Sequence, residues 1–272
     1  MVRAHGITDR GRVRPINEDA LGIDDGLQVL VVADGMGGHN AGEIASRLAV
    51  DAVLEHVRHA FREGVRLKPD TPYEPEATHK PDAAVWPFGF DDSLSFTSNV
   101  LRTAVHLANM SILETAMTSP DLGGMGTTIV AAIVRDGRLS VAHAGDSRLY
   151  LFVGNRLRLL THDDSWISDR LANDPDADPI ALQHHPMRHA LTNVVGAEPR
   201  TDVHVREEAL AGGEILLLTT DGVHGVLDDR RIEELLKEGG RVEDVAAGLV
   251  GAALSRGSRD NCTAVVGQYL AD

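Results

Sequence analysis

Six short apolar runs, each bounded by turn residues, recur along the chain and predict buried strands. These runs are Leu27–Ala33, Thr127–Val134, Leu139–Ala144, Arg148–Val153, Glu214–Thr220 and Cys262–Leu270. Between the run at 148–153 and the apolar stretch at 156–160, the pair Gly154-Asn155 has the chemistry of a two-residue hairpin turn. Neighbouring strands are therefore expected to be antiparallel.

Helical periodicity appears in three separate blocks, at Ala41–Arg62, Ser98–Met117 and Val242–Leu254. Because the strands cluster and the helices stand apart, the pattern favours a layered α+β fold over a parallel βαβ array. The length of 272 residues suits one large domain or two small ones.

Residues 64–97 hold five of the eleven prolines and half of the ten aromatic residues. The prolines predict a long irregular connection between two helices. A disordered linker would be poor in aromatic residues, so we expect a loop that docks on the body, and a mobile segment is the less favoured alternative.

The charge balance is acidic, since 26 Lys and Arg face 41 Asp and Glu, which gives a net charge of −15. This excess argues against a nucleic-acid backbone or an anionic lipid surface as partner. The first 14 residues have the opposite sign, with four arginines against Asp9. This basic N-terminal arm is a candidate anion binder.

Cysteine usage and hydropathy indicate a cytoplasmic protein. Cys262 is the single cysteine, so no internal disulfide is possible, and no Cys and His pair at zinc-finger spacing. The N-terminus lacks the apolar core of a signal peptide, and no apolar run is long enough to span a membrane.

Four aspartates lie at the ends of predicted strands, which is where a metal centre would form. Asp34 and Asp221 each follow an apolar run and precede a glycine, while Asp146 lies between two strands and Asp260 just before the last one. A single Asp-Gly is usually a turn, but buried carboxylates need basic partners or a cation. Oxygen ligands alone favour the hard ions Mg²⁺ or Mn²⁺.

Eight segments in this order resemble the metal-dependent protein phosphatase family, the PPM or type 2C Ser/Thr phosphatases, in its bacterial stand-alone form. The segments are Arg14–Asp19, Val32–Glu43, Gly126–Thr128, Ala144–Arg148, Leu160–Ser165, His185–Arg188, Thr220–Val223 and Ser258–Thr263. The resemblance covers nearly the whole chain and implies one catalytic domain over residues 1–272, with 64–97 as an insertion loop. It also implies an αββα sandwich of two antiparallel sheets flanked by helices.

The resemblance assigns the metal ligands by motif. Asp34 would bridge two Mn²⁺ or Mg²⁺ ions, the Gly35 carbonyl would bind one of them, and Asp221 and Asp260 would complete the pair. Asp146 matches a residue that contributes to a third, weaker site in the family. At the position four after Asp221, where relatives often have Asp, this chain has Gly225, so a third ion would need other ligands.

The resemblance also assigns catalytic roles around the metals. Glu18 and Asp19 would hydrogen-bond to metal-bound waters, and Arg14 would hold the phosphate oxygens, which suits a fixed guanidinium fork. Two ions activate a water for in-line attack on phosphorus, so no phosphoenzyme is required. Where many eukaryotic relatives have a His general acid this chain has Met36, which leaves His39 as a candidate for that role.

The segment that opens at Asp163-Asp164-Ser165 departs from the Asp-His-Ser usual in bacterial members. It begins the flap, residues 163–195, which borders the substrate groove in the family, so the change bears on substrate preference. Three other patterns are weak signals. These are a zinc cluster of His184, His185 and His189, a nucleophile pair of Ser147 with His143, and Cys262 as a nucleophile.

The predicted function is hydrolysis of phosphoserine and phosphothreonine on proteins, opposing a Ser/Thr kinase. Its partners would be phosphoproteins, a cognate kinase and that kinase's targets, with neither nucleic acid nor membrane involved, and a monomer is expected. Two alternatives stay open: a non-catalytic module that binds a phosphoprotein or kinase, and a phosphatase acting on an anti-sigma-factor antagonist.

Overall fold

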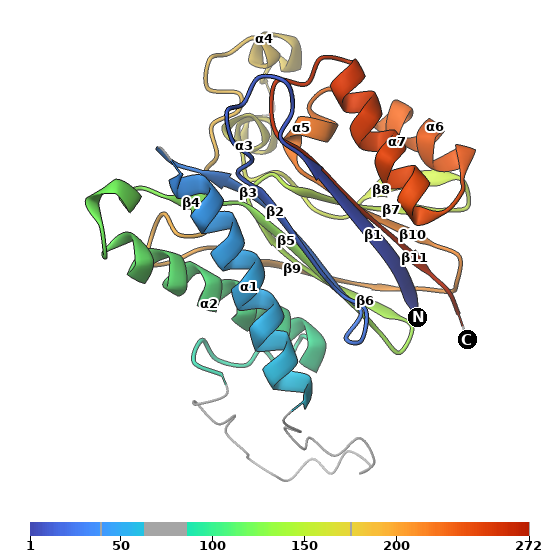
Figure 1. Cartoon of the computed structure of the whole chain (residues 1–272), viewed down its shortest axis with the longest axis horizontal. Helices are drawn as coiled ribbons and strands as arrows, with labels where there is room; N and C mark the ends of the chain where they lie inside the picture. The colour runs from blue at the N-terminus through green and yellow to red at the C-terminus, as the bar shows by residue number, and fades with distance from the viewer. Residues whose placement is uncertain (39, 63–85, 175, 272) are drawn as a thin grey trace.

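Two antiparallel β-sheets packed face to face form the centre of the molecule (Figure 1). The structure, a computed structural model, describes residues 1–38, 40–62, 86–174 and 176–271. The first sheet has the order β1 (Val2–Asp9), β11 (Cys262–Tyr269), β10 (Ile215–Thr219), β7 (Arg148–Val153) and β8 (Arg156–Leu159). The second has the order β2 (Asp19–Asp24), β3 (Val29–Met36), β5 (Ile129–Arg135), β6 (Arg138–Ala144) and β9 (His204–Ala209), with β4 (Gly126–Thr127) paired to β3.

Helices cover the outer face of each sheet, so the four layers run helix, sheet, sheet, helix. The second sheet is covered by α1 (Ala41–Arg62) and α2 (Phe96–Ala116). The first sheet is covered by α5 (Asp221–His224), α6 (Asp229–Glu238) and α7 (Val242–Ser255). Figure 1 shows the two helix groups on opposite sides of the strands. The predicted α+β sandwich is confirmed.

The short elements α3 (Trp166–Asn173) and α4 (Pro179–Gln183) lie at one end of the sandwich, beyond the strand ends (Figure 1). A 3₁₀ turn, η1 (Pro120–Leu122), follows α2. No helix in the described part of the chain is both long enough and apolar enough to cross a membrane.

Alternating side chains of each central strand enter different cores. In β3, Val29, Val31 and Ala33 pack under α1 and α2, whereas Leu30 and Val32 pack in the layer between the sheets. Both faces are thus buried, which explains why these antiparallel strands have continuous apolar sequences rather than an alternating pattern. The same division holds in β10, where Leu217 contacts the helices and Leu216 faces the other sheet.

The hairpin turn predicted at Gly154-Asn155 is confirmed. Val153 on β7 pairs with Arg156 on β8, and both turn residues have positive φ, 56° for Gly154 and 62° for Asn155. Positive φ at both central positions defines the turn type that matches the twist of a hairpin. Asn tolerates this region better than most side chains.

The N-terminal arm differs from the prediction. Residues 2–9 form β1, which pairs with β11 along its whole length, and only residues 10–14 lead as a loop toward the end of the sandwich. Two further strands, β2 and β9, also lack a long apolar run and were not predicted. Each has exposed or half-buried polar residues because each lies at an edge of its sheet.

The insertion predicted at 64–97 lies partly outside the described residues, which resume at Trp86. The prediction for residues 64–85 lies outside the described residues, whereas the part from Trp86 onward packs against the helices. Trp86 is buried and makes edge contacts with Phe90 and Phe96, with ring centroids 5.0 and 5.6 Å apart. Phe96 in turn contacts Phe61 of α1 at 5.8 Å. Residues 96 and 97 already belong to α2 rather than to the loop.

Candidate metal centre

The first half of the site comes from the pairing of β2 with β3. The register places Asp19 directly opposite Asp34, so two carboxylates meet across one strand pair. The Gly35 N–H donates to the Glu18 carbonyl at 3.1 Å, which continues the ladder past the end of β2. A Cβ on residue 35 would overlap the Gly42 carbonyl oxygen, so this close approach between β3 and the start of α1 requires glycine.

The second half comes from the ends of β10 and β11. Asp221 begins α5 directly after β10, and Asp260 lies two residues before β11. A Cβ on Gly222 would overlap the Asn261 carbonyl oxygen, so glycine is again required where these two segments touch. The Ser258 hydroxyl donates to the Gly222 carbonyl at 2.8 Å and holds the segments together.

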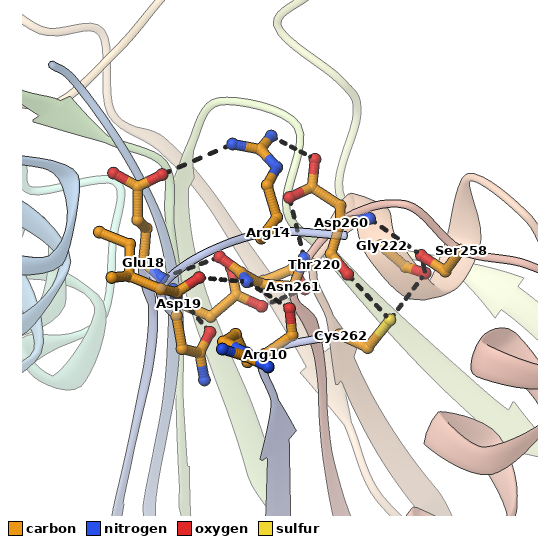
Figure 2. Close-up of polar contacts among 12 residues, drawn as sticks. Arg10, Arg14, Glu18, Asp19, Thr220, Gly222, Ser258, Asp260, Asn261 and Cys262 are labelled. Carbon is orange, nitrogen blue, oxygen red and sulfur yellow. Dashed lines mark hydrogen bonds and ion pairs between the residues drawn. The ribbon is translucent and has the colours of Figure 1, made fainter. Parts of the chain in front are cut away.

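Asn261 connects the two halves. Its side-chain oxygen accepts from the Glu18 N–H at 2.8 Å, and its side-chain amide donates to the carbonyls of Arg10 and Ile16 at 2.8 and 2.9 Å (Figure 2). These bonds fix the loop between β1 and β2 against the segment that precedes β11. The loop carries Arg14, so its position depends on a residue almost 250 positions further along the chain.

Arg14 spans the two halves from above. Its guanidinium donates to Asp260 at 2.6 Å and lies 3.5 Å from a Glu18 oxygen (Figure 2). The Arg14 side chain is 43% exposed, so part of the guanidinium faces solvent. It can therefore still meet an incoming anion.

Several carboxylate oxygens at this site are buried without a hydrogen-bond donor. They are Oε1 of Glu18, Oδ1 of Asp19 and Oδ1 of Asp221. The other Asp19 oxygen accepts from the hydroxyls of Thr220 and Thr263 at 2.8 and 2.6 Å. Buried acceptors without a donor are costly, and a cation is the usual compensation.

Burial and mutual repulsion raise the pKa values of these acids. Burial, with repulsion from Asp19 and Asp221, raises the pKa of Asp34 well above its ordinary value. Burial raises the pKa of Asp19 to about 7, against hydrogen bonds from the two threonines that lower it. Burial and the nearby Asp221 raise the pKa of Asp146 to about 7. The described residues thus supply too little positive charge for these acids, and the all-oxygen donor set fits Mg²⁺ or Mn²⁺.

The structure gathers nearly all of the predicted site residues around one cavity of about 190 Å³. Its lining includes Arg14, Glu18, Asp34, Gly35, Met36, Asp146, Asp221 and Asp260. Asp19 lies behind Asp34 and contacts the threonines instead. His39 lies outside the described residues.

A second cavity, of about 290 Å³, adjoins the first, and both are lined by Asp146, His189 and Asp221. Arg148 lies in its wall and holds Asp163 through two hydrogen bonds of 2.8 and 2.7 Å. Gly225 also lines this cavity, so the position where relatives often have an aspartate supplies no carboxylate here.

The predicted flap is closed at its base by backbone hydrogen bonds. The Trp166 N–H donates to the Ala190 carbonyl at 2.8 Å, and the Thr192 N–H donates to the Asp164 carbonyl at 2.9 Å. Between these bonds the chain forms α3 and α4, and Trp166 stacks on His185 with centroids 4.2 Å apart. The segment is therefore a separate projection beside the second cavity.

One group of side chains was not predicted. His162, Asp164 and His204 place ligand atoms within 4.8 Å of one another, and among the described residues no other three His, Cys, Asp or Glu side chains do so. The aspartates of the first cavity are spread more widely, which suits two ions about 4 Å apart rather than one. Among the described residues, His184, His185 and His189 do not form such a group. Asp164, where bacterial relatives usually have His, was the one sign of this group in the sequence. Its partner His204 lies on β9, a strand that was not predicted.

Comparisons with known proteins agree with this architecture. The family model for protein phosphatase 2C matches residues 11–247. A serine/threonine phosphatase, stp, of Listeria welshimeri is 32% identical over 95% of this chain and 92% of its own length. The crystal structure of the Mycobacterium tuberculosis serine/threonine phosphatase PstP superposes with a TM-score of 0.80 and 28% identity over 99% of both chains. A structure of the PstP catalytic domain with two manganese ions gives a TM-score of 0.77 and 29% identity, over 99% of both chains.

The fold and site thus define a metal-binding hydrolase of the αββα sandwich type. The chain belongs to the protein phosphatase 2C family and is a serine/threonine protein phosphatase.

Proposed function

We propose that this phosphatase removes phosphate from phosphoserine and phosphothreonine in proteins with two divalent ions, Mn²⁺ or Mg²⁺. Asp34, the Gly35 carbonyl, Asp221 and Asp260 would hold them. The observation that carries this proposal is the set of buried carboxylate oxygens without donors, together with the raised pKa of Asp34. When bound, the two ions would supply an activated water for in-line attack on phosphorus and would neutralise phosphate charge.

The protein side chains around these ligands have distinct tasks in this proposal. Glu18 and Asp19 each keep one oxygen free of protein donors, so they can accept hydrogen bonds from water at the centre. Arg14 offers a partly exposed guanidinium at the cavity mouth, where it would orient the phosphate by paired hydrogen bonds. Met36 cannot move a proton, so the leaving serine or threonine would take its proton from solvent or another group.

A third ion would bind more weakly. Asp146 lines both cavities and has a raised pKa, so it can serve a cation on the flap side of the centre. Gly225 gives no carboxylate there, and Asp163 is held by Arg148. Water would have to supply most of the remaining ligands.

Substrate proteins would approach along the second cavity, beside the flap at 163–195. Arg188, an exposed arginine in its lining, would contact the acidic or phosphorylated residues of a substrate, whereas Arg148 is held by Asp163. We further propose a cognate Ser/Thr kinase as the opposing partner, one catalytic domain over residues 1–272, and a monomer. The buried free thiol of Cys262 is compatible with a cytoplasmic location.

The decisive experiment measures hydrolysis of p-nitrophenyl phosphate and a phosphothreonine peptide with added Mn²⁺. Asp34→Asn and Asp221→Asn should each lower kcat/KM by about 1,000-fold or more, since several kcal/mol of metal-derived stabilisation is lost. Asp136→Asn is the matched control, because Asp136 lies in the exposed turn at the far ends of β5 and β6.

Full activity after EDTA treatment and metal-free dialysis would refute the proposal. A protein that binds phosphopeptide but never turns it over would favour the non-catalytic binding module. Preference for a phosphorylated anti-sigma-factor antagonist over the peptide would favour the third possibility.

A further inference from the structure

We propose that His162, Asp164 and His204 form a second type of metal site, suited to Zn²⁺ and separate from the carboxylate centre, with His143 as a fourth ligand. The Asp164 Oδ1 atom lies 2.9 Å from Nε2 of His204 and 3.2 Å from Nε2 of His162. All three ligand atoms lie within 4.8 Å of one another, so small side-chain movements would bring them to one ion.

The strand register supplies the fourth side chain. His143 on β6 lies directly opposite His204 on β9, and its ring centroid is 5.0 Å from the rings of both His204 and His162. The rings of His162 and His204 are 4.1 Å apart. Three imidazoles from β6, β9 and the loop after β8 thus pack together. The His143 nitrogens lie outside the group of ligand atoms within 4.8 Å, so the His143 ring would have to turn toward the ion to bind it.

His143 gives independent support for a ligand. It is only 3% exposed, and its Nδ1 atom is buried without a hydrogen-bond partner. A buried imidazole nitrogen of this kind normally finds a donor, an acceptor or a metal.

Asp164 is already fixed in the orientation that a ligand would need. Its Oδ2 atom accepts from the Gly145 N–H at 2.9 Å and from the Asn193 side-chain amide at 2.7 Å. Oδ1 is thereby directed toward the histidines. Metal-ligating carboxylates commonly have such outer hydrogen bonds, which hold the ligand in place before the ion arrives.

The donor chemistry separates this site from the carboxylate centre. Imidazole nitrogens with one carboxylate oxygen suit Zn²⁺, Co²⁺ or Ni²⁺, whereas oxygen ligands alone suit Mg²⁺ and Mn²⁺. The competing explanation is a hydrogen-bonded cluster without metal, in which a proton on His204 pairs with Asp164. Both explanations use the same contacts, and only direct metal binding distinguishes them.

The test measures Zn²⁺ binding by calorimetry, and Co²⁺ binding by visible absorption, in metal-free Asp34→Asn protein, in which the carboxylate centre is weakened. We expect one equivalent of tight binding that excess Mg²⁺ does not displace. Co²⁺ should give the strong visible bands of a four-coordinate site. His162→Asn and His204→Asn should each weaken Zn²⁺ binding by about 100-fold or more, and His184→Asn, an exposed flap histidine, should not.

His162→Asn keeps the test interpretable, because the His162 side chain is 60% exposed and its replacement should not affect folding. The thermal unfolding midpoint of each variant without metal checks this. Absence of Zn²⁺ binding below millimolar concentration, or binding that His162→Asn and His204→Asn leave unchanged, would overturn the proposal and favour the metal-free cluster. This result would leave the Mn²⁺-dependent phosphatase assay unaffected, so the two proposals fail separately.

Discussion

Two polar clusters lie near one end of the sandwich and treat buried aspartates in opposite ways. At the carboxylate centre, burial and neighbouring acids raise the pKa of Asp34. In the histidine cluster, burial also raises the pKa of Asp164, but hydrogen bonds from His204, the Gly145 N–H and Asn193 bring it below the ordinary value. The two clusters are linked at one point, because Gly145, the residue before Asp146, donates its N–H to Asp164.

The difference lies in where the positive charge comes from. Asp164 obtains it from protein groups, since a proton on His204 and several N–H donors surround it. Among the described residues, the cation in direct contact with the carboxylate centre is Arg14, which is shared between Glu18 and Asp260. Buried carboxylates without enough neighbouring positive charge lower the free energy of unfolding. Such a loss of stability is typical of functional sites.

The largest expected effect is a pH dependence of stability in metal-free protein. Asp19 and Asp146, with pKa values of about 7, hold protons in the folded state that the unfolded chain releases near pH 4. Stability should therefore fall as pH rises from 5 to 8, by about 5 kcal/mol in total. Urea unfolding in EDTA at several pH values measures this.

Saturating Mn²⁺ should abolish that decline, because the ions replace the protons. Asp146→Asn should make the slope shallower, and Asp136→Asn should leave it unchanged. A metal-free protein that becomes more stable between pH 5 and 8 would show that the fold itself compensates the acids of the carboxylate centre.

Asp164→Asn should destabilise the protein by about 3 kcal/mol, because it removes a buried carboxylate whose partners are all in place. The amide cannot accept from the Gly145 N–H, Asn193 and His204 together without presenting its own NH₂ group to a donor. Urea unfolding at pH 7 in EDTA is the measurement. A loss below 0.5 kcal/mol, a size typical of surface substitutions, would show that the histidine cluster is not balanced as described.

Arg14→Ala should lower kcat/KM for p-nitrophenyl phosphate by about 100-fold, equivalent to about 2.7 kcal/mol of transition-state stabilisation. Arg14→Lys should recover only part of this, because an ammonium cannot form the paired hydrogen bonds. Arg12→Ala is the matched control, since Arg12 is an exposed arginine on the same loop. Equal losses for Arg12→Ala and Arg14→Ala would indicate a general charge effect.

The smallest expected effect is a gain in stability, whereas Asp164→Asn causes a loss. Asp34→Asn should raise the free energy of unfolding of metal-free protein by about 1 kcal/mol, because it removes one of several buried acids that repel one another. Urea unfolding of the two variants in parallel gives the contrast directly. Destabilisation by both substitutions would mean that Asp34 is compensated by groups within the fold.

The sequence predicted the central strands because burial on both faces leaves an unmistakable apolar run, as in β3 and β10. The bounds of α1 were also predicted correctly, since its apolar face repeats regularly over Ala41–Arg62. The edge strands β1, β2 and β9 were not predicted, because polar residues and glycines interrupt their apolar positions. The polar sequence of β9 contains no signal that exceeds that of a loop.

The candidate carboxylate centre was largely predictable because its aspartates follow strands and precede glycines. The roles of the individual residues followed from the family resemblance. The raised pKa values of Asp19, Asp34 and Asp146 could be seen only in the structure, because they depend on burial and on neighbouring acids. The histidine cluster was not predictable, because His143 and His204 become neighbours only through the register of β6 with β9. Asp164 attracted attention as a departure from the family pattern, but nothing near it in sequence names His204 as its partner.

The pairing of β1 with β11 has a consequence for how the molecule forms during synthesis. Val2 pairs with Tyr269, and Asp9 with Cys262, so β1 cannot pair with β11 until the chain has been synthesised through residue 269. Contacts over such sequence separations are slow to form. Arg14 and Asp260 therefore meet only after β11 has left the ribosome, and a nascent chain has no complete phosphate-binding site until then.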